Sequence, residues 1–178
     1  MTARLSDLDH ALLGLLARRP ATGYELRLIF QTTPLGSYSD SPGSIYPALA
    51  RLERGGYLRA HHEVSGRRRR TLRLTPKGTS ALGRWLAVPV RAEELIRDRG
   101  SAPLRLAFIS EVAPGRLRPF LREYAQAIAK RLEALLETEE KVMRGLPPSA
   151  RLAYSLGIEV YRAQAAWCRR ILQQRGPK

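Results

Sequence analysis

A short amphipathic segment, followed directly by strand-like sequence, constrains the fold of this chain more than any other feature. Ser41 is a suitable helix cap and Pro42 fits the first helical position, while Gly55 and Gly56 end the pattern. Between them the apolar residues recur at spacings of three and four: Ile45, Ala48, Leu49 and Leu52. We therefore predict a helix that buries one side and leaves a polar side free.

The sequence after this helix predicts an arginine-rich β-hairpin. Residues 58–64 and 67–74 have the composition of two strands, and Ser65-Gly66 supplies a tight turn between them. In the second strand, apolar and polar residues alternate: Leu72 and Leu74 share one face, and Arg69, Thr71 and Arg73 share the other. One face is thus suited to a core and the other to solvent or an anion.

Three further helices are predicted in the first half of the chain. Two of them open with capping-box spacing, which pairs Ser6 with Asp9 and Thr22 with Glu25. The third begins at Thr75-Pro76 and ends before Pro89. Residues 31–40 are expected to form an exposed connection. In the second helix we expect an inward face made of Tyr24, Leu28 and Ile29.

The second half of the chain contains only helical patterns. We predict short helices over residues 92–99 and 104–112, separated by Gly100 and Pro103, and long ones over 114–143 and 149–174. The short connection at residues 145–148 makes the long pair antiparallel. Because two helices alone bury little apolar surface, we expect them to pair with a second copy of the chain.

The predicted fold is therefore mainly α with a small β-hairpin wing. Residues 1–88 would form a winged helix-turn-helix DNA-binding domain, and residues 89–178 an α-helical dimerisation domain. The formal net charge of +15 favours a polyanionic partner, because basic residues placed against phosphates release counterions. The basic residues are spread over both halves, so charge alone does not indicate which half binds.

The winged-helix arrangement points to two groups of DNA contacts. A helix fits the major groove, where base edges carry a distinctive pattern of donors and acceptors. The candidates on the third helix are Gly43, Ser44, Tyr46, Pro47, Arg51 and Arg54, and those on the wing are Arg67, Arg68, Arg69 and Arg70. Other interpretations stay open: a half-buried ring for Tyr46, a solvated face for the helix arginines, and a charged edge that blocks sheet association for the wing.

Nothing in the sequence supports catalysis, a cofactor or a metal site. His61 and His62 point to opposite faces of a strand and His10 lies far away in the chain. We find no phosphate-binding glycine loop, nucleophile elbow or catalytic triad. Cys168 is read as a buried residue in a reducing compartment. The apolar run at residues 11–17 is too short to span a bilayer, so we expect a cytoplasmic protein without a membrane segment.

The chain resembles the PadR family of bacterial transcriptional regulators, and the helix pattern of its C-terminal half resembles the longer subfamily of that family. The resemblance lies in Leu12-Leu13-Gly14-Leu15-Leu16, Gly23-Tyr24-Glu25-Leu26, Gly43-Ser44-Ile45-Tyr46-Pro47-Ala48-Leu49, Gly56-Tyr57-Leu58 and Leu74-Thr75-Pro76-Lys77-Gly78. Thr22 departs from the family, which commonly has His there, and Thr71-Leu72 replaces a frequent aromatic pair.

The resemblance implies a homodimer that binds an inverted repeat of double-stranded DNA, usually as a repressor, and is released by a small molecule or another signal. Two alternatives remain. One is a basic protein that binds RNA or nucleoid DNA without sequence choice. The other is a ligand-sensing interaction protein. Trp85 and Trp167 either pack in the core or line an effector pocket.

Overall fold

The computed structural model describes residues 5–38, 41–62, 70–97 and 101–174, and within them the chain forms two compact units. The first unit comprises residues 1–88 together with 103–114, and the second comprises 89–102 together with 115–178. The sequence-based division at residue 88 differs from this in one segment, because residues 103–114 pack with the first unit rather than with the long helices.

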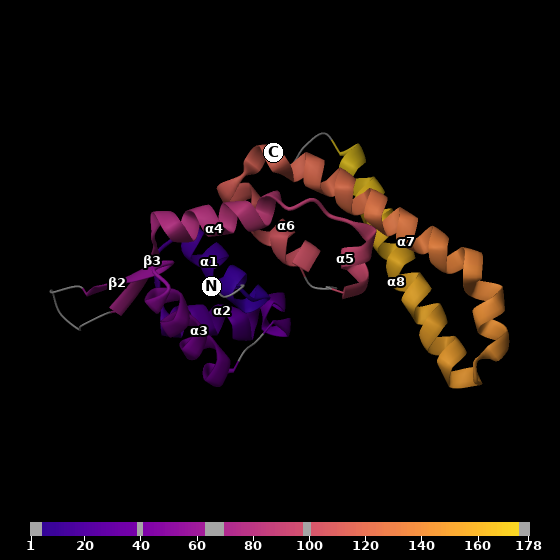
Figure 1. The fold of residues 1–178 in the computed structure, drawn as a ribbon, viewed down its shortest axis with the longest axis horizontal. Coiled ribbons are helices and arrows are strands. Elements are labelled where there is room, and N and C mark those ends of the chain that lie inside the picture. The colour runs from indigo at the N-terminus through magenta and orange to yellow at the C-terminus, as the bar shows by residue number, and fades with distance from the viewer. Residues whose placement is uncertain (1–4, 39–40, 63–69, 98–100, 175–178) are drawn as a thin grey trace. The chain divides into compact units, whose positions relative to one another are not determined.

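The first unit contains six helices and a small sheet among its described residues (Figure 1). In chain order its elements are α1 (Asp7–Arg18), β1 (Ala21–Thr22), α2 (Gly23–Thr32), the 3₁₀ helix η1 (Pro34–Ser37), α3 (Pro42–Arg54), β2 (Leu58–His62), β3 (Arg70–Leu74), α4 (Pro76–Ala87) and α6 (Ser101–Val112). The antiparallel sheet has the order β1-β3-β2. The mainly helical fold with a hairpin is confirmed, and β1 is an addition that the sequence did not reveal.

The predicted capping boxes are both present. At α2, the Thr22 hydroxyl accepts a hydrogen bond from the Glu25 backbone N–H at 3.1 Å, and the Glu25 carboxylate accepts one from the Thr22 backbone N–H at 2.7 Å. The hydrogen bond from the Thr22 backbone is the main reason that the pKa of Glu25 is lowered. The same reciprocal pair joins Ser6 and Asp9 at α1. Thr22 thus caps α2 as the sequence predicted.

Helix α1 is the centre of the first unit. Every residue from Asp9 to Leu16 is buried, so the helix is covered on all sides rather than on one stripe. One of its covers is α6. The Phe108 ring lies directly against Gly14, and the Arg18 guanidinium lies over the same ring, 5.2 Å from its centroid. Helix α6 begins at Ser101, with Pro103 in its first turn, because a first-turn proline sacrifices no helical hydrogen bond.

Helix α2 presents a different face to the core from the one expected. Leu26 and Phe30 are fully buried, whereas Tyr24 is 63% exposed and Leu28 is 46% exposed. The prediction that Tyr24 and Leu28 face inward is therefore wrong. The helix carries two apolar stripes, and close packing at Gly23 decides between them, because a Cβ there would collide with the ring of Tyr46 on α3.

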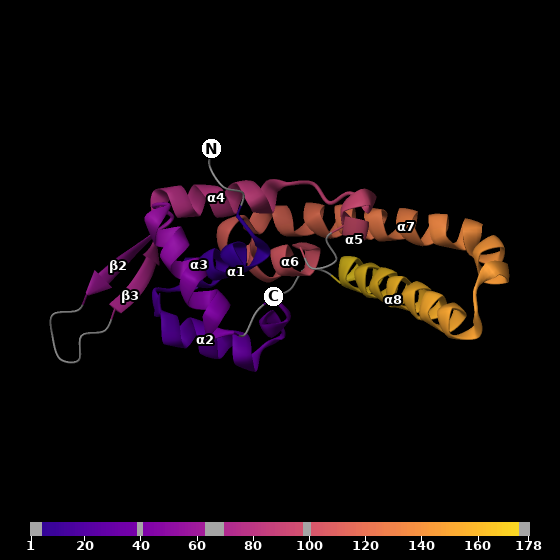
Figure 2. The ribbon, with the colours of Figure 1, turned by 60° about the horizontal axis from the view of Figure 1, so that its bottom comes forward.

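The second unit is built on the long helices α7 (Leu117–Gly145) and α8 (Pro148–Gln173), joined by a connection too short for any but an antiparallel pair (Figure 2). The shorter α5 (Ala92–Arg97) packs on α7. The 3₁₀ helix η2 (Pro114–Arg116) directly precedes α7 in the chain. Cys168 is buried as predicted, and burial raises the pKa of its thiol.

The two tryptophans have different surroundings. Trp85 stacks on His10 with ring centroids 4.4 Å apart and planes 9° from parallel. Trp167 is half-buried on α8. In the described part of the chain, no helix combines the length and apolar character needed to cross a bilayer.

The contact between Gly14 and Phe108 makes a testable prediction about α1. Gly14→Ala should lower the free energy of unfolding by about 1–3 kcal/mol, because the new methyl group displaces a fully buried ring. Gly83→Ala in α4 is the matched control: its Cβ would meet only Val112, at 4.0 Å, so helix propensity should raise stability by about 0.5–1 kcal/mol. Urea unfolding measures both, and equal effects of the two changes would contradict this packing.

Candidate nucleic-acid interface

Helix α3 is divided sharply into a buried and an exposed side. Its apolar side is at most 3% exposed and consists of Ile45, Ala48, Leu49 and Leu52. Its other side is exposed and carries Gly43, Ser44, Tyr46, Pro47, Arg51 and Arg54, the residues predicted from the sequence. Contacts with α1, α2 and β2 hold the buried side. The helix is therefore fixed by one surface and presents the other.

The N-terminal part of α3 leaves polar backbone groups at the surface. Ser41 caps the helix through a hydrogen bond that its hydroxyl accepts from the Gly43 N–H at 3.2 Å. Pro47 lies inside the helix and has no N–H, so it cannot donate to the carbonyl of Gly43 in the preceding turn. The Gly43 carbonyl thus lacks its usual helical donor at an exposed part of α3, whereas the N–H groups of Gly43 and Ser44 already donate to Ser41.

The sequence left two interpretations of Tyr46 open, a DNA contact and a half-buried ring, and the structure is compatible with both. One side of its ring lies against Gly23, where even a methyl group would not fit, yet the residue is 44% exposed. Packing against α2 therefore fixes the ring while part of it remains at the surface. Tyr24, in the first turn of α2, is exposed as well, with the Arg27 guanidinium 5.9 Å from its ring centroid.

Arg51 has a structural partner that sequence reasoning missed. Its Nη2 donates to Oδ1 of Asp9 on α1 at 2.6 Å, and the Asp9 side chain is only 2% exposed. The other carboxylate oxygen of Asp9 accepts two hydrogen bonds from Ser6. The Arg51 side chain nevertheless remains half exposed, at 49%, so the residue ties α3 to α1 and still reaches the surface. No local pattern links positions 42 residues apart in the chain.

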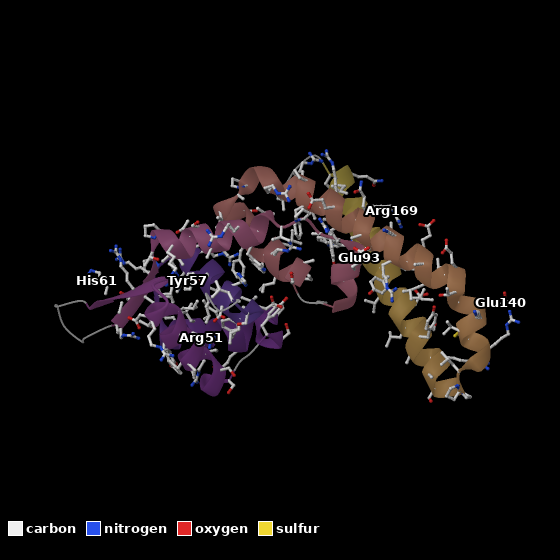
Figure 3. The ribbon with its side chains drawn as sticks, viewed as in Figure 1. Arg51, Tyr57, His61, Glu93, Glu140 and Arg169 are labelled. Atoms are coloured by element: carbon white, nitrogen blue, oxygen red, sulfur yellow. The ribbon has the colours of Figure 1, made fainter. Side chains whose placement is uncertain are left out.

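Arg54 differs from Arg51 in this respect. It is exposed in the last turn of α3, and it forms no hydrogen bond or ion pair with any residue that the structure describes. Its charge is therefore available to an external partner. Figure 3 shows Arg51 on α3 and His61 farther out along the hairpin.

The hairpin is basic on both of its faces. Arg70 forms an ion pair with Glu53 of α3, which ties the base of the wing to the helix. Arg59 and Arg73 are exposed and directly opposite each other in the register of β2 and β3. Like charges in such positions repel, and an anion bound against them would relieve this repulsion. Arg67, Arg68 and Arg69 lie outside the described residues.

Two family models match the chain, one in its N-terminal half and one in its C-terminal half. Residues 12–84 match the family model described as the transcriptional regulator PadR-like family, and residues 99–174 match the virulence activator alpha C-terminal model. Together the two matches cover most of the chain. The chain belongs to the PadR family of transcriptional regulators. This family consists of regulators, so the prediction that the chain is not an enzyme is confirmed.

Individual PadR relatives are moderately similar. The transcriptional regulator YqjI of Escherichia coli is 30% identical over 93 residues, which are 52% of this chain and 42% of that protein. The match therefore spans less than half of that relative. The negative transcriptional regulator PadR of Bacillus subtilis is 25% identical over 143 residues, 79% of this chain and 78% of that protein. The crystal structure of Bacillus subtilis PadR in complex with operator DNA is 23% identical, covers 96% of this chain and 98% of its own, and has a TM-score of 0.45.

Two arginines of α3 provide a matched pair of variants. Arg51→Met should lower the free energy of unfolding by about 1–2 kcal/mol, because it removes a charged donor from the buried carboxylate of Asp9 while water replaces part of the loss. Arg54→Met should change it by less than about 0.5 kcal/mol. Urea titrations distinguish the two, and an Arg51 variant as stable as the Arg54 variant would show that the Asp9 contact contributes little.

Proposed function

We propose that this PadR regulator is a sequence-specific repressor that binds an inverted-repeat operator as a homodimer, with α3 of each subunit in the major groove. The observation that carries the proposal is the division of α3 into a side that is at most 3% exposed and a polar, basic side that is free. A helix held in this way has the shape and the hydrogen-bonding groups for reading base edges.

The proposed contacts follow from position along α3 and the wing. Gly43 lets the backbone come close to a phosphate at the helix N-terminus, where the helix dipole favours an anion and the exposed Ser44 hydroxyl can donate to it. Tyr46, Pro47, Arg51 and Arg54 then face the groove, and Arg67, Arg68, Arg69 and Arg70 follow the neighbouring backbone or minor groove. Glu53 is already paired with Arg70, and Asp9 with Arg51. Among these three arginines we therefore expect Arg54 to contribute most to the affinity for DNA.

Repression, release and cellular location are inferred from the family. The negative regulator of Bacillus subtilis, which matches 79% of this chain, supports a repressor. Release by a small molecule would require different affinities of the effector for two arrangements of the protein. A protein that binds an operator works at the chromosome, which in a bacterium lies in the cytoplasm.

The proposed dimer interface is an apolar stripe on α8. Leu152 is 74% exposed, Leu156 67% and Val160 47%, and their spacing of four places them on one side of the helix. Small residues lie beside the stripe, at Ala153 and Gly157. A second copy of the chain would cover this surface and would also supply the second of the two α3 helices that an inverted repeat requires.

The direct test is selection of bound fragments from the source genome, followed by fluorescence anisotropy on the selected duplex. Arg54→Ala should weaken specific binding by about 1–3 kcal/mol if it contacts a guanine or a phosphate in the groove. Arg84→Ala is the control, since Arg84 is exposed on α4 and bonds only Ser80 among the described residues. If the protein binds random duplexes as tightly as the selected one, it is instead a non-specific nucleic-acid-binding protein.

A second test addresses the dimer. Leu156→Asp should convert the protein to a monomer, because a carboxylate would be buried in the apolar interface. Ser155→Asp is the control, because Ser155 is also exposed on α8 but lies outside the apolar stripe, in a polar row with Glu159 and Arg162. Sedimentation velocity measures the mass. A Leu156→Asp protein that remains dimeric would place the interface elsewhere.

A further inference from the structure

The α7–α8 hairpin carries a group of arginines that the proposed function does not use. Arg118 and Arg122 are four residues apart and therefore share one side of α7. Nη2 of Arg118 donates to the carbonyls of Leu172 and Gln174, at 3.1 and 3.4 Å, so the C-terminal end of α8 lies beside it. Because the two helices are antiparallel, Arg169 lies at the level of Arg122, one turn farther along α7. We call Arg118, Arg122 and Arg169 the arginine face.

The arginine face lies on the side of the hairpin that α5 does not cover. The side toward α5 is marked by a cavity that Leu95, Tyr124 and Gln164 line. Tyr124 is two residues from Arg122, and Gln164 is five residues from Arg169. In a helix with 3.6 residues per turn, both spacings turn the arginine well away from the cavity. The three arginines are accordingly exposed.

No carboxylate neutralises Arg122 or Arg169. Neither residue forms a hydrogen bond or an ion pair with any residue that the structure describes. The nearest acidic residues along the two helices, Glu123 and Glu159, are each paired with another arginine. The other acidic residues of α7 all lie within residues 133–140, toward the closed end of the hairpin, whereas Arg169 lies toward its open end (Figure 3). Unneutralised positive charge is therefore concentrated at the open end.

The chemistry of the arginine face fits the phosphates of a DNA duplex. Guanidinium groups bind phosphate through paired, charge-assisted hydrogen bonds. Arg118 and Arg122 are about 6 Å apart along α7, and packed helices such as α7 and α8 are about 8–10 Å apart. The three cations can thus reach neighbouring phosphates of one backbone.

The surroundings of the arginine face favour a duplex over a single strand. Proteins that hold single-stranded nucleic acid stack its bases on exposed aromatic rings. The aromatic residues of α7 are at most 5% exposed, and those of α8 are half-buried. The described part of the hairpin therefore offers phosphate contacts without a platform for unpaired bases.

We propose that the arginine face binds the phosphate backbone of duplex DNA without sequence choice, as a contact separate from that of α3. Affinity from such a contact falls steeply with salt, because each bound phosphate releases counterions. The backbone belongs either to DNA that flanks the operator or to a second duplex. Only the flanking source rests on the proposed function, since the contact itself needs no operator.

The test compares two double variants of the full chain that change the net charge equally. Arg122→Gln with Arg169→Gln removes two cations of the arginine face, and Lys141→Gln with Arg144→Gln removes two exposed cations near the closed end of the hairpin. Arg118 is kept, because its bonds to α8 also support the hairpin. Fluorescence anisotropy measures the affinity for a random-sequence duplex over a series of KCl concentrations. The slope of log affinity against log salt should fall by about 2 in the arginine variant and by less than about 0.5 in the control.

Equal slopes for the two variants overturn the proposal. So does an arginine variant that loses affinity for single-stranded RNA but not for the duplex, because the face would then bind RNA. If no duplex is selected from the genome, the proposed function fails, while the salt slopes on the random duplex still decide the arginine face.

Two further measurements distinguish the sources of the backbone. A gain in affinity when the selected duplex is lengthened on both sides, lost in the arginine variant, assigns the face to flanking DNA. Capture of a labelled duplex by protein bound to an immobilised one, again lost only in the arginine variant, assigns it to a second duplex. An arginine variant that behaves like the control in both measurements overturns the proposal.

Discussion

The burial of α1 on every side is the constraint from which the architecture of the first unit follows. A helix with eight consecutive buried residues needs neighbours all around it, and α3, α4, α6 and the sheet supply them. Gly14 allows the close approach of α6, because the Phe108 ring occupies the space that a side chain would take. This requirement also explains why residues 103–114 return to the first unit after the chain has left it at Val88.

The same constraint determines how α3 is presented. Its apolar side packs into the body of the unit, and the ion pair between Arg51 and the buried Asp9 ties it directly to α1. The pair between Glu53 and Arg70 then ties the hairpin to α3. Two ion pairs thus connect the wing to α3 and α3 to α1, and they hold the exposed side of α3 in a defined orientation. A preorganised surface of this kind loses little conformational freedom on binding.

Local patterns predicted much of the fold, and the features they missed depend on long-range packing. The capping residues Ser6, Thr22 and Thr75, the amphipathic α3 and the presence of a hairpin all follow from short spacings. The inward face of α2 did not follow from such spacings, because the helix has two apolar stripes that could each face the core. The contact of Gly23 with Tyr46 favours one of them. The Asp9–Arg51 pair and the docking of α6 on α1 likewise join residues far apart in the sequence. For the candidate site, the residues of α3 were identified correctly as exposed, while the second role of Arg51 was not visible.

The central claim is that the free side of α3 lies in the major groove of a specific duplex. It is tested most directly by placing a cysteine at Ser44, attaching an iron chelate that cleaves DNA, and mapping the cuts on a duplex selected from the genome. Cys168 is buried, so the new thiol is the accessible one within the described chain. The account predicts cuts clustered in the major groove at two symmetric half-sites about one helical turn apart. Cuts spread evenly along the duplex would contradict it.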